Sequence, residues 1–146
     1  MWLEVVPATR IASARWTADV PAWALDLDLA VTGADGDLTL DIALGVAGAP
    51  LLTDVVAVRD GEVRRRVGLT DGGLDIRRGE LLWSPEHPTL VDATLTLRAA
   101  DGTVVDRVET YTAMRSVRFD RGRFLLNDRP LPLRLVLDQG YWPQTG

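Results

Sequence analysis

The stretch that decides the fold is Ala24-Leu-Asp-Leu-Asp-Leu-Ala-Val31. Apolar and polar side chains alternate along it, and this period of two is typical of a strand with one buried face. We expect the three leucines to point into a core and the two aspartates, Asp26 and Asp28, to point to water. A shift of one residue would bury both carboxylates, so the pattern also predicts the register.

Further alternating runs lie on both sides of this stretch, separated by turn residues. Leu38-Thr-Leu-Asp-Ile-Ala-Leu44 repeats the pattern after a polar turn. The Asp-Gly pairs at 60–61 and 101–102 each lie between apolar runs, which is the strongest short-range signal for a hairpin. A third hairpin is expected around 120–122. Residues 51–58 are the best helix candidate, but their β-branched content favours a strand.

About seven strands are therefore expected, at spacings of roughly 8–12 residues. The fold class that this predicts is all-β, an immunoglobulin-like antiparallel β-sandwich. No window of ten or more residues shows a helical period.

Composition excludes several classes of protein. The chain has 146 residues, enough for one domain with a core that needs no metal or disulfide, and it has no cysteine. Its 21 acidic residues against 16 basic ones give a net charge of -5, which argues against nucleic-acid binding. We expect the run Arg64–Arg66 to lie on a solvated strand face. No apolar run approaches the roughly 20 residues of a membrane span.

The candidate catalytic and metal-binding groups are few. The one histidine, His87, lies between prolines and close to Ser84, and we expect a structural turn there because no second partner is in reach. A single histidine without cysteines cannot form a transition-metal site. Asp26 and Asp28 have the spacing of a glycosidase acid pair, but on a flat solvated face both should ionise normally.

Tryptophan is unusually frequent, with five residues against two tyrosines and two phenylalanines. Exposed indoles would form a carbohydrate-binding surface, whereas packing in a core or an interface is the commoner role of large aromatic residues. We expect Trp83 to close one end of the sandwich core. Trp16 fits either role, and Trp2 and Trp142 lie where a neighbouring domain would meet the chain.

The C-terminal segment Arg121–Trp142 has the pattern of a hairpin followed by an apolar strand. Leu131-Pro-Leu-Arg-Leu-Val-Leu137 has no alternation beyond Arg134, as is typical of a strand covered on both faces in a parallel sheet. We expect this strand to begin an enzyme domain, and the chain to be a piece of a larger enzyme. Alone, the apolar side chains of residues 127–146 should be poorly packed.

Two parts of the sequence carry a family resemblance. The first is Trp83-Ser-Pro-Glu-His-Pro-Thr-Leu90, followed by a strand, an Asp-Gly turn and Met114-Arg-Ser-Val117. It resembles the immunoglobulin-like middle domain of glycoside hydrolase family 2, the group of β-galactosidases, β-glucuronidases and β-mannosidases. The second is Phe124-Leu-Leu-Asn-Asp128, which is similar to the hairpin that precedes the family's TIM barrel. The chain departs from the pattern at Val91, where tyrosine is usual, and at Ala113, where glycine is usual.

The resemblance implies three parts. Residues 1–10 would be the end of a preceding jelly-roll domain or a linker, residues 11–118 the sandwich, and residues 119–146 the hairpin and first strand of a truncated TIM barrel. The parent enzyme would hydrolyse O-glycosidic bonds with retention, in carbohydrate metabolism. The family's two catalytic glutamates lie on later barrel strands, and none of Glu4, Glu62, Glu80, Glu86 and Glu109 matches either of them. The chain itself would then be a structural domain with no catalytic residue.

The resemblance also implies where the substrate site of the parent enzyme lies. Many members carry Arg-Gly-Val-Asn-Arg-His at the end of barrel strand one, whereas this chain continues from Arg134 to Asp138-Gln-Gly-Tyr-Trp142. Asp138, Gln139 and Trp142 would lie at the C-terminal rim of the strand, the functional face of a barrel. We expect the carboxylate and the amide to bind sugar hydroxyls and the indole to stack on the ring.

The expected partners are the jelly-roll and TIM-barrel domains of the same enzyme, carbohydrate through those domains, and a second copy of the chain through an exposed edge or the C-terminal strip. We expect no cofactor, metal, nucleic acid or membrane, and a cytoplasmic location. Two alternatives remain open: a carbohydrate-binding β-sandwich module, and a free-standing interaction domain whose gene stops near residue 146. Exposed, coplanar indoles at Trp2, Trp16, Trp23 and Trp83 would favour the binding module.

Overall fold

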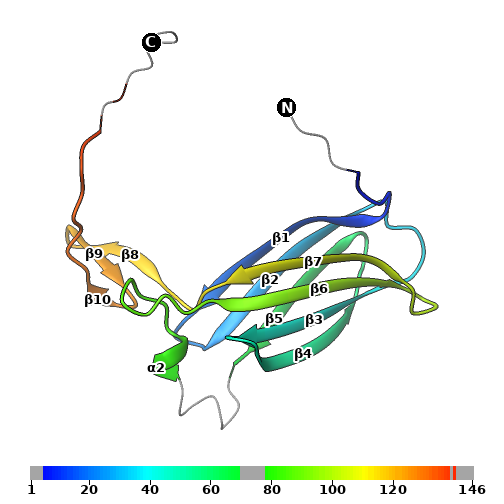
Figure 1. The fold of residues 1–146 in the computed structure, drawn as a ribbon, viewed down its shortest axis with the longest axis horizontal. Helices are drawn as coiled ribbons and strands as arrows, with labels where there is room; N and C mark the ends of the chain where they lie inside the picture. The colour runs from blue at the N-terminus through cyan, green and yellow to red at the C-terminus, as the bar shows by residue number, and fades with distance from the viewer. Residues whose placement is uncertain (1–4, 70–77, 139, 141–146) are drawn as a thin grey trace.

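The computed structural model describes residues 5–69, 78–138 and 140, and within them the fold is a sandwich of two antiparallel sheets (Figure 1). The three-stranded sheet has the order β1-β2-β5 and the four-stranded sheet the order β4-β3-β6-β7. Their strands are β1 (Arg10–Asp19), β2 (Ala24–Thr32), β3 (Leu38–Val46), β4 (Ala49–Ala57), β5 (Glu62–Gly68), β6 (Val91–Ala99) and β7 (Val104–Thr112). The predicted all-β sandwich of about seven strands is confirmed.

The strand β2 has the register that its alternation predicts. Leu25, Leu27 and Leu29 are at most 4% exposed and point between the sheets. Asp26 and Asp28 lie on the outer face, directly opposite Arg66 and Arg64 of β5. The ion pairs across this face explain how the sheet keeps two aspartates and two arginines at its solvated surface.

The core lies between the two sheets and is entirely apolar among the described residues. It is built from alternate positions of β2, β3, β5 and β6, closed by Leu69 and Met114: Leu25, Leu27, Leu29, Val31, Leu38, Leu40, Ile42, Leu44, Val63, Val67, Val91, Ala93, Leu95 and Leu97. Burial of these side chains is the main force that holds the sheets together.

The Asp60–Gly61 turn joins the two sheets, so the hairpin predicted there is wrong. Both residues have positive φ, and Arg59 and Glu62 exchange two backbone hydrogen bonds across the turn. However, β4 pairs with β3 and β5 pairs with β2, so the chain passes from one sheet to the other. The Asp101–Gly102 hairpin is confirmed, because β6 pairs with β7.

A small third sheet follows the sandwich. Its strands are β8 (Val117–Asp120), β9 (Arg123–Leu126) and β10 (Arg129–Pro130), in the order β10-β9-β8. The hairpin expected around 120–122 is thus confirmed. A one-turn helix, α2 (Arg78–Leu81), precedes Trp83 and was too short to show a period in the sequence. No described helix has the length and apolar character needed to cross a membrane.

The apolar segment after β10 is not a strand in this chain. Residues 131–138 have no regular secondary structure, and Leu135, Val136 and Leu137 are each more than 80% exposed. A strand needs a neighbour along its length to pair its backbone groups, and this segment has one such bond, at its start, from the backbone N–H of Leu131 to the carbonyl of Phe124 in β9 at 2.9 Å. The expectation that these side chains are poorly packed in the chain alone is confirmed for this segment.

Candidate functional site

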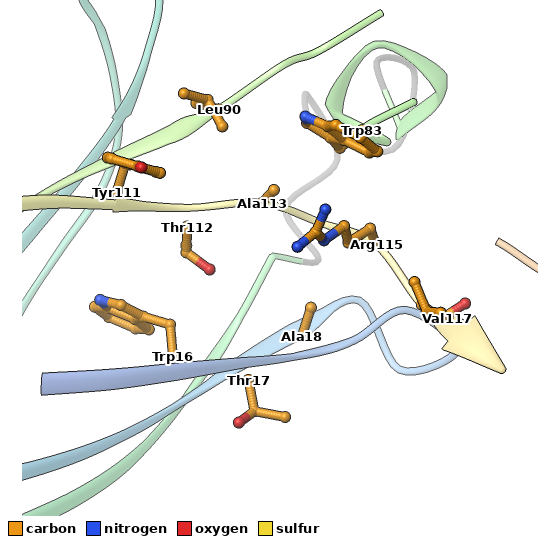
Figure 2. Close-up of a pocket in the computed structure, with 11 residues that line it drawn as sticks. Trp16, Thr17, Ala18, Trp83, Leu90, Tyr111, Thr112, Ala113, Arg115 and Val117 are labelled. Carbon is orange, nitrogen blue, oxygen red and sulfur yellow. The ribbon is translucent and has the colours of Figure 1, made fainter. Parts of the chain in front are cut away.

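The site that the structure presents is a cleft of about 710 Å³ between β1 and β7, beside the Trp83 segment (Figure 2). β1 and β7 are the edge strands of the two sheets on this side of the sandwich. At one end they are tied together, because the backbone N–H of Ile11 donates to Oδ2 of Asp106 at 2.8 Å. The cleft opens at the other end, where residues 16–18 face residues 111–113 and 115–117.

Arg115 is positioned in the cleft by the residues around it. Met114 is completely buried, and its carbonyl accepts a hydrogen bond of 2.9 Å from the backbone N–H of Trp83. The next residue, Arg115, lays its guanidinium over the Trp83 ring at 4.9 Å from the ring centroid. Such stacking holds an arginine in place while leaving its N–H groups free to bind an anion.

Asn127 joins the Trp83 segment to the small sheet. Its side-chain N–H donates to the carbonyl of Trp83 at 3.0 Å, and its side-chain oxygen accepts from the backbone N–H of Ser116 at 3.0 Å. A third bond, from the backbone N–H of Asn127 to the Ser116 carbonyl, measures 2.9 Å. This one residue, from the Phe-Leu-Leu-Asn motif, therefore fixes the position of the cleft wall.

The cleft has no acidic side chain in its lining. The lining residues are aromatic, apolar or hydroxyl-bearing, with Arg115 as the one charged group among those described: Trp16, Thr17, Ala18, Trp83, Leu90, Tyr111, Thr112, Ala113, Arg115, Ser116 and Val117. Without a pair of carboxyl groups, these side chains do not form the acid and nucleophile that glycoside hydrolysis uses. With Arg115 as its charged group, the arrangement can bind an anionic group.

The segment with the one histidine forms a turn, as predicted. Ser84 and His87 exchange backbone hydrogen bonds, and the Ser84 hydroxyl oxygen accepts from the backbone N–H of His87 at 3.1 Å. The hydroxyl is thus used to hold the turn, and Thr89 is tied to the carbonyl of Glu80. Among the described residues, no group of three or more His, Asp or Glu side chains could hold a metal ion.

The aspartates of β2 have structural roles. Nη1 of Arg66 donates to Oδ2 of Asp26 at 3.0 Å, and Nε of Arg64 lies 3.9 Å from Oδ1 of Asp28. Both carboxylates lie on the outer face of the sheet against arginines, and no cleft separates them. They are not placed as an acid pair for glycoside hydrolysis.

The described tryptophans are half-buried. Trp16 and Trp23 pack against the core, whereas Trp83 lies outside it and lines the cleft, so the expectation that Trp83 closes the core is wrong. The ring N–H of Trp16 is buried with no acceptor among the described residues, and in Figure 2 it lies on the side of the indole remote from Arg115. Trp2 lies outside the described residues. Trp16, Trp23 and Trp83 therefore do not form the exposed platform that a carbohydrate-binding module requires.

Of the predicted substrate residues, only Asp138 is described, and its side chain is exposed in the irregular segment. Gln139 and Trp142 lie outside the described residues. The sequence reasoning missed the cleft and Arg115. The motif Met114-Arg-Ser-Val117 was visible in the sequence. The stacking of Arg115 on Trp83 was not, because the fold brings together the segment after β7 and the segment that contains Trp83.

The fold and the cleft define a class of protein: an immunoglobulin-like sandwich domain with an appended hairpin and a cleft between the edge strands of its two sheets. The chain belongs to glycosyl hydrolases family 2, whose family model matches residues 9–115. The match covers the whole sandwich and ends at Arg115.

Solved structures with this fold support the same class. A β-glucuronidase from Ruminococcus gnavus in complex with D-glucuronic acid is 18% identical, with a TM-score of 0.60 over 88% of this chain and 20% of that chain. The apo structure of the same organism's β-glucuronidase gives 18% identity and a TM-score of 0.60, over 88% and 19%. The complex with D-glucaro 1,5-lactone gives 17% and 0.58, over 86% and 19%. This chain spans about a fifth of the length of those structures.

Proposed function

We propose that this chain is the non-catalytic, immunoglobulin-like structural domain of a family 2 glycoside hydrolase. The observation that carries the proposal is that the family match, residues 9–115, coincides with the sandwich, whose cleft between β1 and β7 has no carboxylate or imidazole in its lining. The sandwich braces the catalytic domain, and its partners are the jelly-roll and TIM-barrel domains of the same enzyme.

The reaction of the parent enzyme is hydrolysis of an O-glycosidic bond with retention of configuration. Retention requires two carboxyl groups about 5–5.5 Å apart, one as the nucleophile and one as the acid and base. In the sandwich, Asp26, Asp41 and Asp54 serve in ion pairs and Asp101 in a turn. The two catalytic carboxylates are therefore supplied by the barrel that follows the appended hairpin.

Asp138, Gln139 and Trp142 belong to the substrate site of the parent enzyme in this proposal. The side chain of Asp138 is exposed, which leaves it accessible to a barrel and a substrate in the parent enzyme. Replacing Gln139 with Ala or Trp142 with Ala in the complete enzyme should lower kcat/KM. Unchanged kinetics in both variants would exclude these residues from the substrate site.

The direct experiment compares this chain with the complete product of its gene. Both are assayed on p-nitrophenyl β-D-glucuronide, β-D-galactoside and β-D-mannoside, and NMR identifies the anomer formed first. The complete product should hydrolyse at least one of them with retention, and the chain alone should hydrolyse none. Hydrolysis by the purified 146-residue chain, or a complete product without glycosidase activity on any glycoside, would overturn the proposal.

A further inference from the structure

The cleft between β1 and β7 combines features that mark a binding surface for polypeptide. Its rim carries exposed apolar side chains, with Leu90 at 40%, Tyr111 at 66% and Val117 at 52% exposure. Trp83 and Arg115 lie inside this rim. Tryptophan, tyrosine and arginine, surrounded by apolar side chains that exclude water, are the residues that dominate binding energy in protein interfaces.

The charge of the cleft indicates that its occupant carries a negatively charged group. Arg115 makes no ion pair with any described carboxylate, whereas Arg65, Arg66 and Arg98 elsewhere on the sandwich each contact one. In a chain with an excess of acidic residues, the cleft lining contains none. Figure 2 shows the guanidinium of Arg115, which follows β7, and the hydroxyl of Thr112, at the end of β7, among the side chains that line the cleft. These groups are donors, and the matching acceptor is a carboxylate.

The strands that border the cleft favour an extended occupant. β1 and β7 are edge strands, and alternate backbone N–H and C=O groups on an edge strand have no partner within the sheet. The Ile11–Asp106 contact satisfies one such group at the closed end. At the open end, a segment in β conformation would find backbone donors and acceptors on either side.

We propose that this cleft is the docking site for an extended, acidic segment from another domain of the same enzyme, whose carboxylate pairs with Arg115. An apolar residue next to that carboxylate packs on the rim formed by Leu90, Tyr111 and Val117. The inference rests on the proposed function, because the docked segment is assigned to another domain of a family 2 enzyme, and this chain spans about a fifth of the solved enzymes that it matches. Docking there fixes the orientation of the sandwich relative to the neighbouring domain.

Hydrogen–deuterium exchange tests the docking site by comparing this chain with the complete enzyme. The amides of residues 16–18 and 111–117 should exchange on the order of ten-fold more slowly in the complete enzyme, because docking pairs or covers them. The amides of β3, which pairs with β4 on one side and with β6 on the other, serve as an internal reference and should exchange equally in both proteins. Equal exchange of the cleft amides in the two proteins overturns the docking site.

Variants of Arg115 test the carboxylate. In the complete enzyme, Arg115→Gln should remove most of the added protection and lower the Tm, and Arg115→Lys should retain part of both because the charge remains. In the 146-residue chain both variants should change the Tm only slightly. Arg107→Gln in β7 is the control, since its side chain is 58% exposed and pairs with Glu109 outside the cleft. If Arg115→Gln behaves like this control in the complete enzyme, the carboxylate assignment is wrong.

The two proposals fail in different ways. A complete enzyme that is an active, retaining glycosidase but leaves the cleft amides unprotected contradicts the docking site alone. A gene product without glycosidase activity contradicts the proposed function. It also contradicts the assignment of the docked segment to another domain of the same enzyme.

Discussion

Arg65 of β5 and Asp54 of β4 join the two sheets of the sandwich along one edge. Nε of Arg65 lies 2.6 Å from Oδ2 of Asp54 and Nη2 lies 3.2 Å from Oδ1, a two-pronged contact. Arg65 shares its side of β5 with the buried Val63 and Val67, so it points inward at the edge. Arg64 and Arg66 lie on the opposite side of β5, and the side chain of Arg65 is itself 45% exposed, so the solvated arginines of this run are divided between the two sides of the strand.

We expect Arg65→Ala to destabilise the chain by about 1 kcal/mol, because two-pronged pairs in a partly buried setting exceed the usual surface ion pair. Urea unfolding followed by tryptophan fluorescence measures the change. Arg64→Ala is the control, since its side chain is 80% exposed and its nearest carboxylate oxygen is 3.7 Å away. A double-mutant cycle with Asp54→Ala should give a coupling free energy of similar size that decreases with salt. Zero coupling would mean that the contact contributes nothing to stability.

Asn127→Ala should destabilise the Trp83 segment by about 1–3 kcal/mol, because the Trp83 carbonyl and the Ser116 N–H both lose their partner. The backbone of Asn127 has φ +51, a conformation that alanine adopts with strain. Asn127→Gly separates the two effects, since glycine removes the amide without the strain. Urea unfolding of all three proteins measures both contributions. If glycine restores wild-type stability, the amide bonds are not what holds the segment.

Leu40→Ala should cost about 2–5 kcal/mol, because the side chain is fully buried at the centre of the core and its removal leaves a cavity. Val55→Ala on the neighbouring β4 is the control, since that side chain is 63% exposed and its loss should change stability by less than about 0.5 kcal/mol. Equal effects of the two substitutions would contradict the position of the core. Thermal or urea unfolding is sufficient for the comparison.

The Asp19 carboxyl should make stability depend on pH in the acid range. The side-chain hydrogen bond from Arg66 and the backbone N–H of Ala22 lower the pKa of Asp19 below its ordinary value of 3.8. A pKa that is lower in the folded state adds stability above pH 3.8, and this stability is lost as the pH falls through the folded-state pKa. The difference in unfolding free energy between the wild type and Asp19→Asn should therefore shrink below pH 3.8. Arg66→Gln should weaken the same dependence, and a difference that stays constant with pH would contradict this assignment.

The alternation of β2 was sufficient to predict the sandwich, because burying one face of a strand dictates its register. The hairpin between β3 and β4 was missed, since its turn residues Ala47 and Gly48 both have positive φ and alanine is not a usual residue for that turn. The sequence of β4 also hides its strand pattern. An apolar residue, Val55, is exposed, whereas a charged residue, Asp54, points inward and pairs with Arg65.

The candidate site could be predicted from the sequence only in part. The Trp83 and Asn127 motifs were visible as a family pattern, but the bonds that connect them join residues 44 positions apart. Arg115 carries no local signal, because its role depends on β1 and β7 meeting as the edges of different sheets. The apolar run after β10 has the composition of a strand that is covered on both faces. It can form a strand only where a neighbouring strand pairs with its backbone groups.

The turn at Asp60–Gly61 also bears on the speed of folding. Because the chain changes sheet there and again between β2 and β3, neither sheet can be completed from neighbouring hairpins alone. Leu38 must find Ala99, and Ala24 must find Gly68, before the two layers can close on each other. Pairings this distant in sequence require large loops to close early, which places such chains among the slower two-state folders, in the range of milliseconds to seconds. The sandwich should thus be the slowest part of the chain to form, and the hairpin of β8 and β9, whose strands are adjacent, the fastest.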